Sequence, residues 1–63
     1  MDSPVIFTIT KEKDVFYKVY TRDPRGAEYN LLSHVDRSAT FGRMQKITRE
    51  LNDKGYAVLF EVD

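Results

Sequence analysis

The sequence predicts an α+β fold in which one helix packs on one face of a single three- or four-stranded, mainly antiparallel sheet. Two segments near the start of the chain are rich in β-branched and aromatic residues. A stretch of helical periodicity follows, ends at a glycine and leads into another segment of strand character. The order is therefore β-β-(β)-α-β, in one domain over residues 1–63, because a second core would need roughly 100 more residues.

The first two strands are predicted over residues 4–10 and 15–21, joined as a β-hairpin. In an antiparallel pair, the numbers of two residues that lie opposite each other always add up to the same sum. Whether this sum is even or odd decides which side chains share a face. An odd sum would place Lys18 among Phe7 and Ile9 and bury its charge without a partner. We therefore prefer an even sum, which requires a hairpin loop of three or five residues.

The even register divides the hairpin into two faces. The face intended for the helix carries Val5, Phe7, Ile9, Val15, Tyr17 and Val19. The opposite face carries Ile6, Thr8, Thr10, Phe16, Lys18 and Tyr20, with Leu59 as a candidate further member. One helix covers one face, so the second face stays open unless another molecule binds it.

A turn ends the second strand, since residues 23–26 read Asp-Pro-Arg-Gly and proline favours the second position of a type I turn. Residues Ala27 to His34 are compatible with a third, antiparallel strand or with a packed loop. We prefer the strand.

The helix begins after Asp36 or Ser38, either of which can serve as the N-cap. Six residues then fall on one side at helical spacing: Thr40, Phe41, Met44, Ile47, Thr48 and Leu51. Gly55 is suited to the left-handed position that ends a helix, where a Schellman motif brings Tyr56 against Leu51.

The last strand is expected over residues 56–62, with Tyr56, Val58, Phe60 and Val62 on one face. If the connection from the helix is right-handed, this strand lies beside the first one, in the interior of the sheet.

Composition excludes several classes of site. Ten basic residues balance ten acidic ones, so no overall charge draws the chain to nucleic acid or to an anionic membrane. Cysteine is absent and His34 is the one histidine, which excludes disulfides and typical zinc sites. No glycine-rich phosphate loop or other cofactor motif occurs, so we expect no cofactor. The apolar runs are too short to span a membrane, and the expected location is cytoplasmic.

One cluster, Ser33, His34, Asp36 and Ser38, contains the residue types of a hydrolase. Neighbours in sequence rarely meet as nucleophile, base and acid, and no glycine turn that could form an oxyanion hole precedes them. The favoured interpretation is a surface loop that leads into a capped helix, and we expect no catalytic activity.

The open sheet face is the main candidate for function, through Ile6, Phe16, Lys18 and Tyr20. Exposed apolar residues on a small domain commonly mark an interface. The chain is therefore predicted to be a small non-catalytic protein-interaction module, an inhibitor or regulator of a larger protein or a homodimer subunit. The alternative is a half-exposed face whose side chains shield one another, or one covered by residues 27–34.

Nucleic-acid binding is the second functional hypothesis. Four basic residues occur in or just before the helix: Arg37, Arg43, Lys46 and Arg49. Aromatic residues on an open sheet, here Phe16 and Tyr20, can stack on RNA or single-stranded DNA bases. The two features lie on opposite sides of the predicted sheet, so one strand of nucleic acid could not easily use both.

Overall fold

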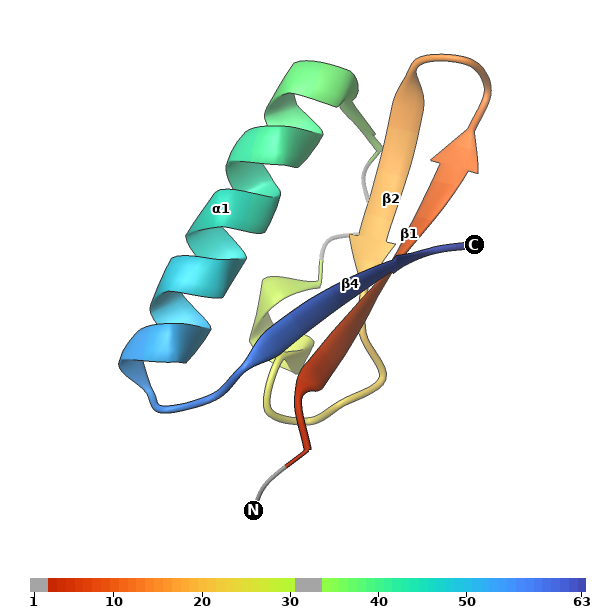
Figure 1. Ribbon diagram of the computed structural model, residues 1–63. Helices are drawn as coiled ribbons and strands as arrows, with labels where there is room; N and C mark the ends of the chain where they lie inside the picture. Colours follow the sequence, from red (N-terminus) through yellow and green to blue (C-terminus); the bar gives the residue numbers. More distant parts are fainter. Residues whose placement is uncertain (1–2, 31–33) are drawn as a thin grey trace.

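The computed structural model describes residues 3–30 and 34–63, which form a four-stranded sheet with one long helix across it (Figure 1). The elements are β1 (Val5–Glu12), β2 (Phe16–Tyr20), the short 3-10 helix η1 (Ala27–Tyr29), β3 (Val35–Asp36), α1 (Arg37–Asp53) and β4 (Val58–Val62). The strand order is β3-β2-β1-β4, with β4 parallel to β1 and the other pairs antiparallel. The predicted α+β fold is confirmed.

The hairpin has the even register predicted from Lys18. Thr10 lies opposite Lys18, and Glu12 lies opposite Phe16, which leaves a three-residue loop. Lys13 begins this loop with a φ of 58°, in the left-handed region. Val15 lies in the loop and is exposed, so its predicted place on the covered face is wrong. The loop, rather than strand pairing, sets its direction.

The hydrophobic core lies between the sheet and α1. Its fully or nearly fully buried apolar side chains come from β1, β2 and α1: Val5, Phe7, Ile9, Val19, Ile47 and Leu51. The ring of Phe7 contacts that of Phe60, at a centroid distance of 5.8 Å. Phe41, predicted to share this helix face, is instead 63% exposed on the flank of the helix. The covered face of the sheet is thus the one predicted.

The third strand was preferred within residues 27–34, and the described residues of that range, 27–30 and 34, do not form it. Residues 27–29 form η1, residues 31–33 lie outside the described residues, and the strand is Val35–Asp36, paired with β2. The Asn30 side chain accepts a hydrogen bond from the Thr21 amide and donates one to the Thr21 carbonyl, both at 2.8 Å. One side chain therefore occupies the backbone groups just beyond β2 that a neighbouring strand would use.

Both predicted ends of the helix are present. The Asp36 carboxylate accepts a hydrogen bond of 2.8 Å from the Ala39 amide, which identifies Asp36 as the N-cap. Gly55 has a φ of 91°, and the amide of Tyr56 donates to the Leu51 carbonyl at 2.9 Å. This is the Schellman arrangement, and it turns the chain into β4.

β4 lies beside β1, as expected, but at the edge of the sheet rather than in its interior. The reason is that the short β3 pairs with β2, so no strand of the described residues lies outside β4. No helix in the described part of the chain has the length and apolar character to cross a membrane.

Candidate interaction surface

The sheet face opposite α1, here called the open face, carries its apolar residues at two separate ends. Ile6 on β1 and Leu59 on β4 are direct neighbours and are 41% and 54% exposed. Phe16 is opposite Glu12, six residues further along β1, which places it roughly 20 Å from Ile6. Of the predicted partner-binding residues, the structure therefore brings Ile6 near Tyr20 but leaves Phe16 apart.

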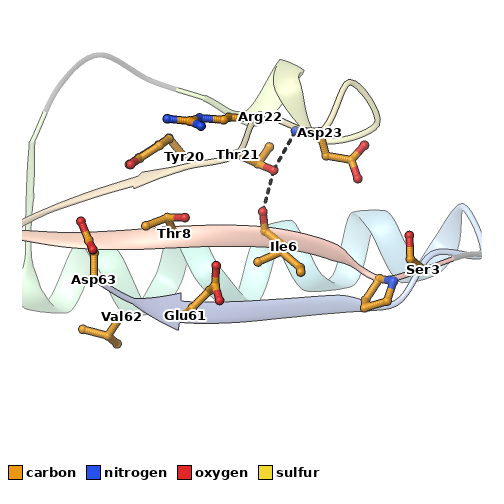
Figure 2. Close-up of a pocket in the computed structure, with 11 residues that line it drawn as sticks. Ser3, Ile6, Thr8, Tyr20, Thr21, Arg22, Asp23, Glu61, Val62 and Asp63 are labelled. Carbon is orange, nitrogen blue, oxygen red and sulfur yellow. Dashed lines mark hydrogen bonds between the residues drawn. The ribbon is translucent and has the colours of Figure 1, made fainter.

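A hollow of about 730 Å³ lies at the Ile6 end of the open face (Figure 2). Its lining comes from β1, β2, β4 and the segments that flank them: Ser3, Pro4, Ile6, Thr8, Tyr20, Thr21, Arg22, Asp23, Glu61, Val62 and Asp63. Lys18 is two residues before Tyr20 on β2, and its ammonium group lies 5.2 Å from the centre of the Tyr20 ring. The lining of the hollow is therefore mixed, with a few apolar side chains such as Ile6 among polar and charged ones.

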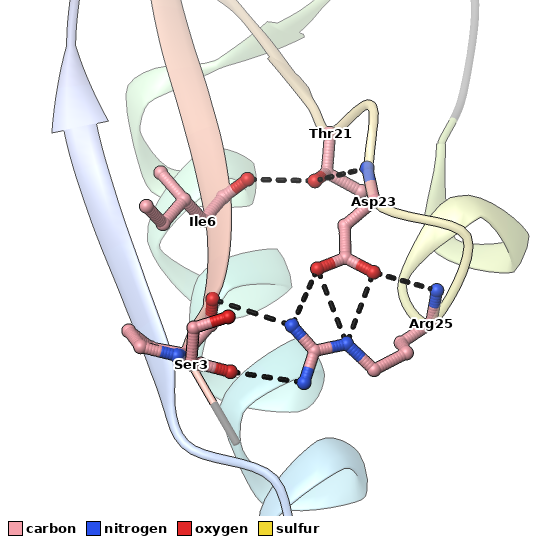
Figure 3. A network of polar contacts seen from close by, with 6 residues as sticks. Ser3, Ile6, Thr21, Asp23 and Arg25 are labelled. Carbon is pink, nitrogen blue, oxygen red and sulfur yellow. Dashed lines mark hydrogen bonds and ion pairs between the residues drawn. The ribbon is translucent and has the colours of Figure 1, made fainter. Parts of the chain in front are cut away.

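A polar network fixes the rim of this hollow (Figure 3). The Thr21 hydroxyl donates to the Ile6 carbonyl at 2.6 Å and accepts from the Asp23 amide at 3.1 Å. Arg25 forms an ion pair with Asp23 at 2.6 Å and donates to the Ser3 carbonyl at 2.9 Å. These bonds join the start of β1 to the turn after β2, so the backbone around Ile6 is held in place.

Asp23 is the rim group with a shifted pKa. Hydrogen bonds from the Arg25 side chain, and then from the Arg25 amide, lower the pKa of the Asp23 carboxyl below its usual value. The guanidinium of Arg25 also lies 5.3 Å from the Tyr56 ring, just after the helix end. Arg25 thus connects the rim to the segment that leads into β4, while its charge balances that of Asp23.

Phe16, at the far end of the open face, has polar neighbours. His34 Nε2 lies 2.7 Å from a carboxylate oxygen of Glu12, which is the residue opposite Phe16. Asp36 pairs with Phe16 from the other side and is occupied as the helix N-cap. The apolar surface around Phe16 is therefore small.

The four predicted nucleic-acid contacts do not form one stripe. Lys46 lies near Glu28 and Tyr29 on one side of α1, whereas Arg37 lies near Val15 on another. The Arg43 guanidinium donates to the Tyr29 carbonyl, and partial burial lowers the pKa of Arg43.

Arg49 borders a hollow beside Phe60. The structure therefore separates Arg37 from Lys46 and commits Arg43 to an internal hydrogen bond.

The cluster of Ser33, His34, Asp36 and Ser38, for which a surface loop leading into a capped helix was preferred, has two members with structural partners. Asp36 caps α1, and His34 contacts Glu12. Ser33 lies outside the described residues, and Ser38 is exposed in the first turn of the helix. Within residues 3–30 and 34–63, no three His, Asp or Glu side chains lie close enough to hold a metal ion together.

Comparison of the chain with protein-family models, with curated proteins and with solved structures finds no match. Sequence reasoning missed the network of Arg25, although the Asp-Pro-Arg-Gly turn contains its two charged members. It also did not identify β4 as an edge strand, because that requires the strand order.

Proposed function

We propose that this chain is a small non-catalytic protein-interaction module that inhibits or regulates a larger protein by binding it through the open face. The observation that carries the proposal is the adjacent pair Ile6 and Leu59, both substantially exposed beside the hollow. Apolar side chains that stay accessible on a small domain are typical of contact surfaces. A cytoplasmic location belongs to the same proposal, since a chain without cysteine needs no oxidising compartment.

The charges around the hollow indicate the chemistry of the partner. Glu61 and Asp63 contribute two carboxylates, Arg22 contributes one cation, and the charge of Asp23 is balanced by Arg25. With Asp23 balanced, the surplus among the residues that line the hollow is therefore one negative charge, while the Lys18 ammonium lies beside Tyr20, outside the lining. The fitting partner is a protein surface with an apolar side chain to seat on Ile6 and a lysine or arginine beside it.

Affinity capture from the source cells, followed by reconstitution with the purified partner, tests this function. Ile6→Ser should weaken binding at least tenfold, because truncating a hot-spot residue at the centre of an interface costs about 2 kcal/mol or more, and about 1.4 kcal/mol already corresponds to tenfold. Val15→Ser is the matched control, since Val15 is exposed and lies in the hairpin loop, away from the hollow. It should change the dissociation constant less than twofold.

Two results would contradict the proposal: a partner that binds the Ile6→Ser chain as tightly as the original, or capture of nucleic acid alone. Phe16→Ser measures how far the contact extends, since Phe16 is at the opposite end of the open face. Nucleic-acid binding through Arg37, Lys46 and Arg49 stays a prediction, and a titration of mixed oligonucleotides at rising salt concentration tests it.

A further inference from the structure

The outer edge of β4 offers unpaired backbone groups. The Ala57 carbonyl accepts from the Val5 amide, and the Asp63 amide donates to the Ile9 carbonyl, so the odd-numbered residues of β4 direct their backbone groups at β1. Successive residues of a strand alternate, so Val58, Phe60 and Val62 direct their amides and carbonyls away from the sheet. No other strand of the described residues lies there.

This edge lacks the features that usually prevent strand addition. Such features are a very short strand, a proline, a lysine or a bulge. The other edge, β3, has two residues, whereas β4 has five, which read Val-Leu-Phe-Glu-Val. Glu61 is its one charged residue, and its side chain belongs to the open face. The edge is therefore able to pair with another strand.

Apolar side chains flank the edge on both sides of the sheet. Leu59 is on the open face, and Val62, on the helix side, is 76% exposed. Between β4 and α1 lies a second hollow of about 440 Å³, lined by Phe41, Met44, Gln45, Thr48, Arg49 and Phe60. A strand that added to β4 would cover part of this apolar surface.

The chain also exposes more surface than a compact monomer of its size. Its accessible surface is 4633 Å², whereas a monomeric protein of this mass exposes about 4,200 Å². Its radius of gyration is 11.4 Å, against roughly 10.6 Å for a compact domain of this length. Both differences are in the direction expected of a chain that buries further surface against a partner.

We propose that two copies of this chain pair through β4 in antiparallel orientation, about a two-fold axis at Leu59. In this register, Val58 of one copy pairs with Phe60 of the other through the outward-facing amides and carbonyls. The two Leu59 side chains meet on the open face, where a non-hydrogen-bonded pair has its Cα atoms about 4.5 Å apart. The result is one continuous eight-stranded sheet.

A second copy fits this edge better than an isolated peptide. A two-fold axis perpendicular to the sheet places both helices on the same side, so each copy brings its own Phe41 flank toward the apolar surface above the paired strands. Because the net charge of the chain is zero, charge repulsion between two copies does not oppose self-association. Glu61 faces Ala57 of the other copy, and the two Glu61 residues are roughly 13 Å apart along the strands.

Sedimentation velocity over a concentration series tests the dimer. The chain should change from monomer to dimer with rising concentration. Leu59→Lys should weaken dimerisation at least tenfold, because it places two lysines opposite each other at the axis. Val15→Lys is the matched control, since Val15 and Leu59 are both 54% exposed, and it should leave dimerisation within twofold.

Cysteine cross-linking tests the register, because the chain contains no cysteine and a single introduced one can form only an intermolecular disulfide. Leu59→Cys should cross-link on mild oxidation, whereas Glu61→Cys should not, since disulfides need Cα atoms within about 7 Å. Cross-linking at Phe60→Cys instead would overturn the proposed register.

A chain that stays monomeric at every concentration would overturn the dimer. Loss of partner binding in Ile6→Ser would then still support the proposed function, because Ile6 is on β1 and outside the β4 edge. The two proposals therefore fail separately.

Discussion

Ile6 and Phe7 are neighbours in β1, yet they have opposite surroundings. Phe7 is completely buried between the sheet and α1 and contacts the ring of Phe60, whereas Ile6 is 41% exposed on the open face. The same contrast holds in β4, where Phe60 packs on the core and Leu59 does not. The covered face thus carries the contacts that hold the fold together, whereas Ile6 and Leu59 on the open face stay exposed.

The largest expected effect comes from breaking the covered face. Phe7→Ala should destabilise the protein by about 3–5 kcal/mol, the usual cost of removing a buried phenylalanine side chain. That is as much as a core of this size supplies, so the variant should be largely unfolded. Ile6→Ala is the control and should cost less than about 1 kcal/mol. Urea unfolding measures both, and similar costs would contradict the division into two faces.

A smaller effect is expected where the backbone approaches Phe7. A Cβ atom at Gly26 would lie 2.8 Å from Cζ of Phe7, and Gly26 is itself buried. Gly26→Ala should therefore destabilise the protein by about 1–3 kcal/mol through overpacking.

Gly42→Ala gives the matched comparison, because a Cβ at Gly42 has no neighbour within 4 Å and the residue lies within α1. This change should instead stabilise the protein by about 0.5–1 kcal/mol through helix propensity. Thermal unfolding distinguishes the two, and a gain of stability in Gly26→Ala would show that Phe7 can move aside.

The smallest effect is expected at the rim of the open face, in acid. Because Arg25 lowers the pKa of Asp23 in the folded state, the ionised carboxylate contributes stability above its unfolded pKa of about 3.9. This contribution is lost as the pH falls through the lowered pKa. Asp23→Asn should therefore lose less stability than the original chain between about pH 4 and pH 2. Urea unfolding at both pH values measures the free energy of unfolding of each chain. An equal loss of this free energy in Asp23→Asn and in the original chain would contradict this role.

The features that were predicted correctly from the sequence depend on local chemistry. The cost of burying Lys18 identified the hairpin register, and Gly55 identified the end of the helix. The start of the helix was narrowed to Asp36 or Ser38, and the structure has Asp36 as the N-cap. Each of these choices depends on one residue and its near neighbours, which is why the sequence was sufficient.

The features that were missed depend on long-range contacts. Asn30 bonds to the backbone of Thr21, nine residues away, and so takes the place of a strand that the composition of residues 27–34 favoured. The position of β4 at the edge follows from where β3 pairs. Phe41 fits the helical spacing of the core residues, but it lies at the border of that stripe, where it is 63% exposed and lines a hollow beside Phe60.

Amide hydrogen exchange in β4, followed by NMR at several protein concentrations, tests most directly whether another chain fills the uncovered edge. The amides of Leu59 and Glu61 face β1 and should be protected at every concentration. Those of Val58 and Phe60 face outward, so they should exchange rapidly in dilute protein and become protected as the concentration rises. Outward amides that exchange rapidly at all concentrations would contradict pairing through β4.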